Sequence, residues 1–530
     1  MTQVDPATAP TAEQPDQMTH RQILEALSGL LLAMFVAMLS STVVSNALPR
    51  IVTDLEGSQT GYTWVVVATL LAMTATTPIW GKLADLFSKK LLVQTALVIF
   101  SVGSVVATLA NSMEVLIGAR VIQGLGIGGL TALVQVVISS MVSPRERGRY
   151  SGYIGAVFAA ATVSGPLIGG LIVDSPMGWR GCFAIGIPFA IAAFVLLQKT
   201  LHLPVIKREV KIDYLGATLI MGGVSILLIW VSLAGNQFEW ASGTSYALVA
   251  AGLLVTLVAV FVEIKIAAEP VIPMYLFRDR TMSLATVASA LVGVAMFGST
   301  VYLSQYFQLA RGMSPTKAGL MTVAMVVPLM LSSLLSGRVI TRTGVWKRWL
   351  VAGMFLVVVA LVLLGTIDES THLVLVGLFM AVLGLGMGAT MQNLVLAVQN
   401  NVPLSELGAA SSVVAFFRSM GGTAGVSVLG AILGTQVADK VASGYQAAQQ
   451  APSGDFGTHT IPDLASLAPW EAQIWEHGFG ASIGELYLIA APAALLAFLC
   501  VLFIKEVPLR TTLSLPEEVA PEATEELQTR

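Results

Sequence analysis

The chain has 530 residues, of which 55% are hydrophobic and only 11% are charged. A soluble domain carries roughly 25% charged residues, so this deficit excludes a water-soluble fold. The formal net charge of -3 gives no sign of a nucleic-acid partner, and we expect none.

The chain begins with a polar segment, residues 1–23, which lacks the basic start and cleavage pattern of a secretory signal peptide. We expect a disordered cytoplasmic tail there. Apolar stretches of roughly 20 residues follow, which is the length that a helix needs to cross a bilayer. The first six, within residues 24–200, are expected at 24–48, 63–80, 91–110, 113–141, 148–173 and 180–200.

A basic loop and two further spans, at 213–235 and 245–265, occupy residues 201–270. The last six spans fall within 271–505, at 281–308, 315–340, 348–367, 372–399, 407–437 and 481–505. A polar stretch at 438–480 is expected to be a long external loop, and residues 506–530 an acidic cytoplasmic tail. The sequence therefore predicts an all-α membrane protein with fourteen transmembrane helices, arranged as six, two and six.

Positive charge is distributed unevenly over the predicted loops. With both termini in the cytoplasm, 21 of the 28 Lys and Arg lie in cytoplasmic segments, and two, Arg120 and Arg418, lie within helices. Positive residues in short loops resist translocation, so this orientation is favoured. We expect a multi-pass protein of the cell membrane, with the lipid bilayer as its surroundings.

The loop Gly81–Lys90, which reads GKLADLFSKK, follows the second span, and Gly337–Arg348 has the same layout in the last six. Each begins with Gly at a helix end and finishes with paired positive charges, which indicates a duplicated six-helix half. Asp85 lies close in sequence to Lys89 and Lys90, where it can pair with them or bind a helix N-terminus. The simpler interpretation is an ordinary positive loop with one stray acid.

Gly81–Lys90 resembles the cytoplasmic loop signature of the major facilitator superfamily, G-x-L-a-D-r-x-G-r-k, with Ser88 in place of the usual Gly. The resemblance implies that the loop holds the cytoplasmic ends of two halves together in one conformer. In the fourth span, Leu116–Gly126 resembles the signature l-x-x-x-R-v-x-Q-G-x-g, whose polar members here are Arg120 and Gln123. A guanidinium in a membrane helix is costly, so a functional role is the first hypothesis and snorkelling to the outer interface the alternative.

The fifth span carries Gly165, Pro166, Gly169 and Gly170, with Ala161 ahead of them. This run resembles the antiporter signature of the same superfamily, g-x8-G-x3-G-P-x2-G-G, with Ala161 replacing one Gly. Proline bends a helix and glycines allow close packing, so the run implies an element that moves during transport.

Further stretches resemble the fourteen-helix drug/proton antiporter branch of the superfamily. They are Trp179-Arg180 before the sixth span, Asp213 with Gly216 in the seventh, Tyr306–Pro315, and Arg418–Gly422 in the thirteenth. The branch usually has an acid in the first span, and Ser40 stands there instead. The remaining intramembrane acids lie toward helix ends, so proton coupling is implied by the resemblance alone.

A pathway for lipophilic compounds needs apolar and aromatic walls with a few polar groups. The candidates to line it are Asn46, Phe297, Tyr302, Tyr306, Gln308, Met391, Gln392 and Asn393. Each has the alternative of packing between helices or facing lipid.

The resemblance implies a secondary transporter that exports lipophilic small molecules, with a proton gradient as its energy source. The alternative within transport is export of an endogenous lipid or secondary metabolite. A membrane-embedded enzyme would need a metal or nucleophile constellation, and the five histidines are scattered without paired spacing. No Walker-type loop is present in the sequence, so we expect neither ATP nor a metal or other cofactor.

Overall fold

The computed structural model describes residues 20–55, 59–173, 175–201, 213–235, 237–267, 270–449 and 467–510. The predicted tail at 1–23 and the end of the chain after 510 therefore lie almost entirely outside the described residues. Thirteen described helical segments are long and apolar enough to span a bilayer. A further helix of 30 residues, α5, packs among them against α1 and α12.

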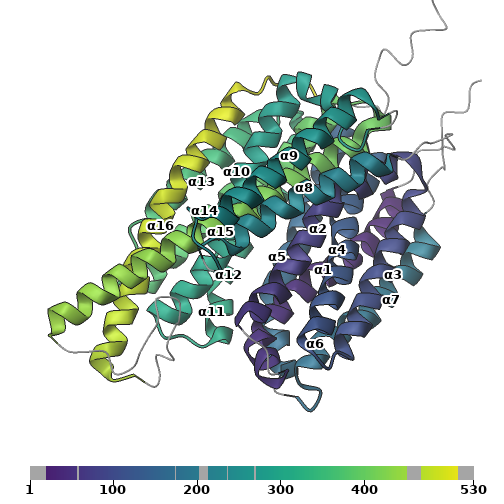
Figure 1. The fold of residues 1–530 in the computed structure, drawn as a ribbon. Coiled ribbons are helices and arrows are strands. Elements are labelled where there is room, and N and C mark those ends of the chain that lie inside the picture. The colour runs from purple at the N-terminus through teal and green to yellow at the C-terminus, as the bar shows by residue number, and fades with distance from the viewer. Residues whose placement is uncertain are drawn as a thin grey trace, which may run out of the picture.

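The predicted order of six, two and six helices is confirmed (Figure 1). The N half consists of α1 His20–Asp54, α2 Gln59–Leu86, α3 Lys89–Thr108, α4 Met113–Met141, α5 Pro144–Val173, η1 Gly178–Arg180, α6 Gly181–Ala184 and α7 Gly186–Thr200. The inserted pair is α8 Tyr214–Leu233 and α9 Gly243–Lys265. The C half consists of η2 Met274–Arg278, α10 Arg280–Gln305, η3 Tyr306–Ala310, α11 Pro315–Met321, α12 Val323–Thr343, α13 Lys347–Leu364, α14 Leu373–Asn401, η4 Leu404–Glu406, α15 Leu407–Ala448 and α16 Pro469–Phe503.

Several helices begin where a short polar side chain can accept a backbone N–H bond. Such capping side chains precede α3, α4, α8, α9, α10 and α11, and are Ser88, Ser112, Asp213, Ser242, Asp279 and Ser314. They satisfy donors that the first helical turn leaves without partners. At the other end of α12, Gly344 adopts a left-handed conformation with φ of 74°, which favours glycine.

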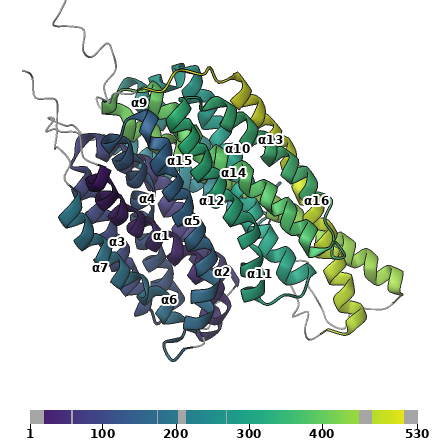
Figure 2. The same cartoon turned by 180° about the vertical axis from the view of Figure 1, so that it is seen from behind.

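The duplication predicted from the two loops is visible in the packing of the halves. In the N half α2 and α3 pack on α4, and α1 on α5 and α7; in the C half α12 and α13 pack on α14, and α10 on α15 and α16. The contacts between halves are paired in the same way, because α2 meets α15 and α5 meets α12. The two halves lie side by side in both views (Figures 1 and 2).

We call the end of the bundle with loops 87–88, 142–143, 344–346 and 402–406 the tail face, and the end with loops 109–112 and 365–372 the far face. Figure 1 has the tail face at the top. The segment 504–510 lies against the tail face of the C half: Arg510 donates to the carbonyls of Gln399 and Val402, and Asn400 donates to that of Pro508. The described start of the predicted acidic tail is therefore packed on the bundle.

At the far face, the structure differs from the prediction of a long loop at 438–480. Helix α15 continues to Ala448 and α16 begins at Pro469, so both helices extend into this segment and project from the bundle (Figure 1). The buried side chains Val437 and Val441 are four residues apart, as are Trp475 and Phe479, so each pair lies on one helix face. Polar composition suggested a loop, but this apolar spacing stabilises a helical hairpin.

The inserted pair lies across one junction of the halves. Helix α8 contacts both α2 and α15, and α9 contacts η2. Glu263, near the end of α9, is buried and accepts hydrogen bonds from the backbone N–H groups of Val271 and Ile272 at 3.2 Å each. This carboxylate therefore fixes the pair to the segment that leads into the C half.

Candidate transport pathway and gate

Asp85 joins the two halves at the tail face. It lies at the end of α2, and its two carboxylate oxygens accept hydrogen bonds from the backbone N–H groups of Gly408 and Ala409, each at 2.8 Å. These N–H groups belong to the first turn of α15, where the helix dipole favours a negative charge. One carboxylate of the N half thus caps a helix of the C half.

The backbones around this contact approach closely. A Cβ atom on Gly81 would lie 2.0 Å from the hydroxyl oxygen of Ser412, and one on Gly408 would lie 2.3 Å from the carbonyl oxygen of Gly81. Only glycine fits at either position without a shift of the helices. The predicted role of Gly81 as a close-contact residue agrees with this geometry.

The positive charges of the predicted loop are divided between two places. Lys89 lies near enough to Asp85 to act on its charge. Lys90 instead donates to the carbonyl oxygen of Gln198 in α7 at 2.8 Å. Ser88, which departs from the family signature, accepts a hydrogen bond from the N–H of Leu91 and so caps α3.

A second link between the halves was missed by sequence analysis. Arg147, near the start of α5, is buried and donates to the side-chain oxygen of Gln399 in α14 at 3.1 Å. Gln399 in turn donates to the hydroxyl of Ser411 in α15 at 2.8 Å. In the sequence Arg147 is one of several arginines after the fourth span, and nothing there distinguishes it from an ordinary positive loop residue.

A third link lies deeper, where Gln135 of α4 donates to the side-chain oxygen of Gln392 in α14 at 3.1 Å. Gln392 is a predicted pathway residue, so in this conformation it helps to close the passage. Together with the Asp85 contact and the Arg147 contact, this hydrogen bond holds the halves together on the tail-face side.

Arg120 is fully buried in the N half, about 10 Å from the far-face start of α4. Its Nε donates to the carbonyl oxygen of Val65 at 3.1 Å, and its Nη1 to the side-chain oxygen of Gln123 at 3.0 Å. Gln123 donates in turn to the hydroxyl of Ser104 at 2.9 Å. The guanidinium is therefore part of a network that joins α2, α3 and α4 and does not snorkel to the interface, and its functional role stays a prediction.

The glycine run of α5 brings it against α1. A Cβ atom on Gly165 would lie 2.2 Å from the hydroxyl oxygen of Thr42, and one on Gly169 would lie 3.2 Å from the carbonyl oxygen of Val43. Thr42 also donates to the carbonyl of Ala161, which stands where the signature has Gly. The side chain of Pro166 and the surroundings of Gly170 are outside the described set, and the helical backbone continues past both positions.

The predicted pathway residues occupy different surroundings. Tyr302 and Tyr306 are buried in the C half, where their hydroxyls donate to the carbonyls of Val426 and Asp368. Asp368 lies in the loop before α14, and the hydroxyl of Ser370 donates to its carboxylate, which lowers the pKa of that carboxyl. Both tyrosines therefore stabilise the C half in this conformation.

Gln308 of η3 donates to the hydroxyl of Ser304 at the end of α10, and Asn393 donates to the carbonyl of Ala389 within α14. Phe297 and Met391 are half-buried, and the side chain of Asn46 is outside the described set. The structure thus brings Gln392 to the junction of the halves, whereas the lining role of the other candidates stays a prediction.

Arg418 differs from every other predicted gating residue. It lies eleven residues into α15, about 16 Å from the tail-face end, which is about half the thickness of a bilayer core. Its Nη1 atom is buried without a hydrogen-bond partner.

Comparison with known proteins decides the family. Residues 30–426 match the model of the Major Facilitator Superfamily. The chain belongs to this superfamily. It is 34% identical over 407 residues to the multidrug transporter protein MdtP of Bacillus subtilis, covering 77% of this chain and 74% of that one.

A second relative within the superfamily is the efflux pump dotC of Dothistroma septosporum, with 32% identity over 92% of this chain and 84% of that one. Among solved structures, the proton:xylose symporter XylE superposes with a TM-score of 0.58 at 14% identity, over 90% of this chain and 95% of that chain. At that identity the likeness shows the fold alone.

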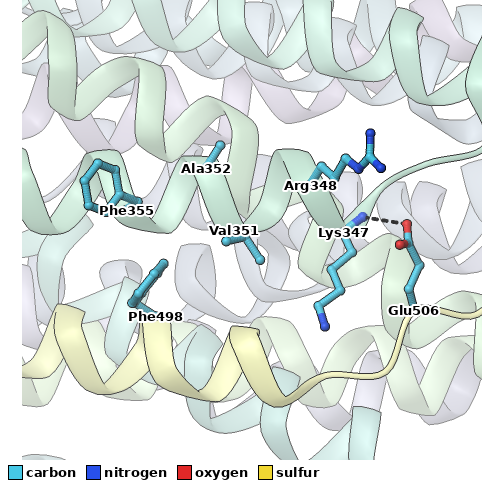
Figure 3. A pocket seen from close by; sticks show the side chains of 7 residues that line it. All are labelled: Lys347, Arg348, Val351, Ala352, Phe355, Phe498 and Glu506. Carbon is cyan, nitrogen blue, oxygen red and sulfur yellow. Dashed lines mark hydrogen bonds between the residues drawn. The ribbon is translucent and has the colours of Figure 1, made fainter.

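One groove among the described residues lies away from the junction of the halves. It has a volume of about 510 Å³ and lies between α13 and α16, where Phe355 and Phe498 form one end and Lys347, Arg348 and Glu506 the other (Figure 3). Phe355 is exposed on the outside of the bundle. The groove therefore lies on the outer surface of the C half.

Proposed function

We propose that the chain exports lipophilic small molecules from the cytoplasm by alternating access, in exchange for protons. The printed names of its relatives, a multidrug transporter and an efflux pump, support export of small molecules. The observation that carries the proposal is the capping of α15 by Asp85. It is a contact between halves that can open without unfolding either of them.

The distribution of positive charge supports the tail face as the cytoplasmic side. Of the 28 Lys and Arg, 21 belong to this side or to the segments that continue from it. With the Asp85, Arg147 and Gln135 links formed, the conformer is closed toward the cytoplasm. Release of these links would admit a compound from that side.

Asp85 is also the first candidate for the coupled proton, with Glu263 and Asp213 behind it. Protonation would remove the charge that the α15 N-terminus stabilises, and would leave one oxygen a donor facing N–H donors. The neutral acid would therefore weaken the contact between the halves. A proton taken up from outside and released inside would in this way be tied to opening at the tail face.

The test is export in proteoliposomes with an imposed pH gradient, using wild type and Asp85→Asn. We expect wild-type export to follow the gradient and to stop when an ionophore dissipates it, whereas Asp85→Asn loses uphill export. Asp279→Asn is the matched control, because Asp279 caps α10 in the same manner but within one half. Export that ignores the gradient in wild type would contradict proton exchange, and full coupling in Asp85→Asn would remove Asp85 from it.

A further inference from the structure

Arg418 is a partly buried cation without a counter-charge among the described residues. None of the hydrogen bonds or ion pairs among the described residues involves its side chain, and Nη1 is enclosed without any acceptor. Among the carboxylates of the described helices, Glu485 lies in the middle of the neighbouring α16 and is paired with Lys440 at 2.7 Å, and the others lie closer to helix ends. An unpaired guanidinium in a low-dielectric setting is costly, so the fold retains a charge that it does not itself satisfy.

Arg418 lies on the same helix as a residue that takes part in the contacts between the halves. Ser411 lies seven residues earlier, two turns along the same side of α15, and accepts the hydrogen bond from Gln399. Gln399 also binds Arg147 of the N half. Arg418 therefore lies about 10 Å farther from the tail face than Ser411, on the same side of α15 as the residue that takes part in these links between the halves.

Two hydroxyls on α10 share this environment. The backbone carbonyl of Arg418 packs against Gly293, where a Cβ atom would lie 2.0 Å from it. Ser289 and Thr286 lie one and two turns from Gly293 on the same face of α10, and both hydroxyls are buried without partners. Arg418 and these two hydroxyls thus lie on two helices of the C half that pack together, six to eleven residues from the tail-face ends of α10 and α15.

We propose that Arg418 binds the acidic group of the transported compound, so that the chain exports lipophilic anions. A guanidinium presents its N–H groups as a planar fork that matches a carboxylate, sulfonate or phosphate, and a charge-assisted pair of this kind is strong in a dry site. Ser289 and Thr286 would donate to the remaining oxygens. The apolar body of the compound would lie against the apolar side chains that neighbour them.

This inference rests on the proposed export function and names the class of compound exported. It also accounts for the absence of a mid-depth carboxylate. A cationic drug placed beside Arg418 would meet like charge with no acid to offset it, whereas an anion would neutralise the site. Neutral analogues would lack the paired bonds and bind less tightly.

The test compares three fluorescent probes with one aromatic body: 1-pyrenebutyric acid, 1-pyrenebutanol and 1-pyrenemethylamine. Binding is measured at pH 7.5 to the full chain in nanodiscs without any ion gradient, so the result does not depend on proton exchange. We expect the acid to bind wild type at least tenfold more tightly than the alcohol, and the amine to bind most weakly. Equal affinity for acid and alcohol, absence of binding included, would overturn the proposal.

Variants locate the effect at Arg418. Arg418→Gln should remove the preference for the acid and change the affinity for the alcohol by less than twofold, which also shows that the variant is folded. Arg418→Lys should retain part of the preference, since a point charge replaces the fork. Arg278→Gln, which removes an exposed charge from the same half, should behave as wild type. A tenfold preference that persists in Arg418→Gln would place the anion site elsewhere.

Discussion

Two arginines lie at depth inside membrane helices, one in each half, and their surroundings differ. Arg120 is bonded to the backbone of Val65 and to Gln123, whose own amide is bonded to Ser104. Arg418 has no partner, and the hydroxyls of Ser289 and Thr286 have none either. The N half uses its charge to join three helices, whereas the C half leaves its charge available.

The contrast separates stability from recognition. A buried charge with all its donors paired is a structural element, and its removal leaves acceptors unsatisfied. A buried charge without partners lowers stability, and its retention points to a ligand. If this division is correct, substitution of Arg120 should mainly lower the free energy of unfolding. Substitution of Arg418 should mainly weaken binding of the compound.

The largest effect is expected for Arg120→Ala. The change leaves the amide oxygen of Gln123 buried without this donor and removes one of the donors to the carbonyl of Val65, which should lower the free energy of unfolding by about 3 kcal/mol or more. Thermal unfolding in nanodiscs should show a clearly lower Tm, and export should fall with the folded fraction. A normal Tm combined with lost export would make Arg120 a functional residue and end the contrast.

Arg418→Met should change the free energy of unfolding in the opposite direction. It replaces an unpaired buried charge with an apolar side chain of similar length, so the free energy of unfolding should rise by about 1 kcal/mol. Export of 1-pyrenebutyric acid by the same variant in proteoliposomes should fall at least tenfold. Loss of stability on this substitution would mean that Arg418 has a structural partner, and the comparison would fail at that point.

Asp85→Asn should change the conformational equilibrium rather than the stability of either half. Loss of the charge at the α15 N-terminus weakens the contact by about 1 kcal/mol, which moves the equilibrium roughly fivefold toward the open tail face. Spin labels at the exposed positions Phe87 and Arg348 would report a longer distance in that population. Asp279→Asn should leave the distance unchanged, and equal distributions in all three proteins would contradict a latch at Asp85.

The smallest effect is expected for Ser289→Ala. The hydroxyl has no partner, so its loss should change the free energy of unfolding by less than about 0.5 kcal/mol. Affinity for the acid probe should still fall two- to threefold, because one donor to the anion is gone. Ser104→Ala is the matched variant in the N half, where the same atom is bonded and stability should fall by about 1 kcal/mol.

Much of this architecture follows from local sequence. The length of the apolar runs and the two Gly-led loops predict fourteen helices in two related halves, and the loop motif singles out Asp85. Its partners Gly408 and Ala409 are more than 300 residues away, and only the assembled fold brings them together. Arg147 and Gln135 were missed for the same reason, because their partners lie in the other half.

The two arginines show the limit most clearly. In sequence both are single cations in apolar helices, and each falls within a run that resembles a family signature. Whether such a charge is paired depends on side chains of other helices, which spacing along one helix does not reveal. The helical extensions of α15 and α16 escaped prediction because polar composition outweighed a short apolar repeat at Val437 and Val441.

The inserted pair makes the two junctions of the halves unequal. The fold is duplicated, so α2 meets α15 on one side much as α5 meets α12 on the other. Among the described helices, α8 packs on both members of the first junction, α2 and α15. Glu263 ties that cover to the C half. We therefore expect a compound that enters from the bilayer to approach the junction of α5 and α12. Additional helices of this kind give a symmetric carrier a preferred side of approach from the lipid.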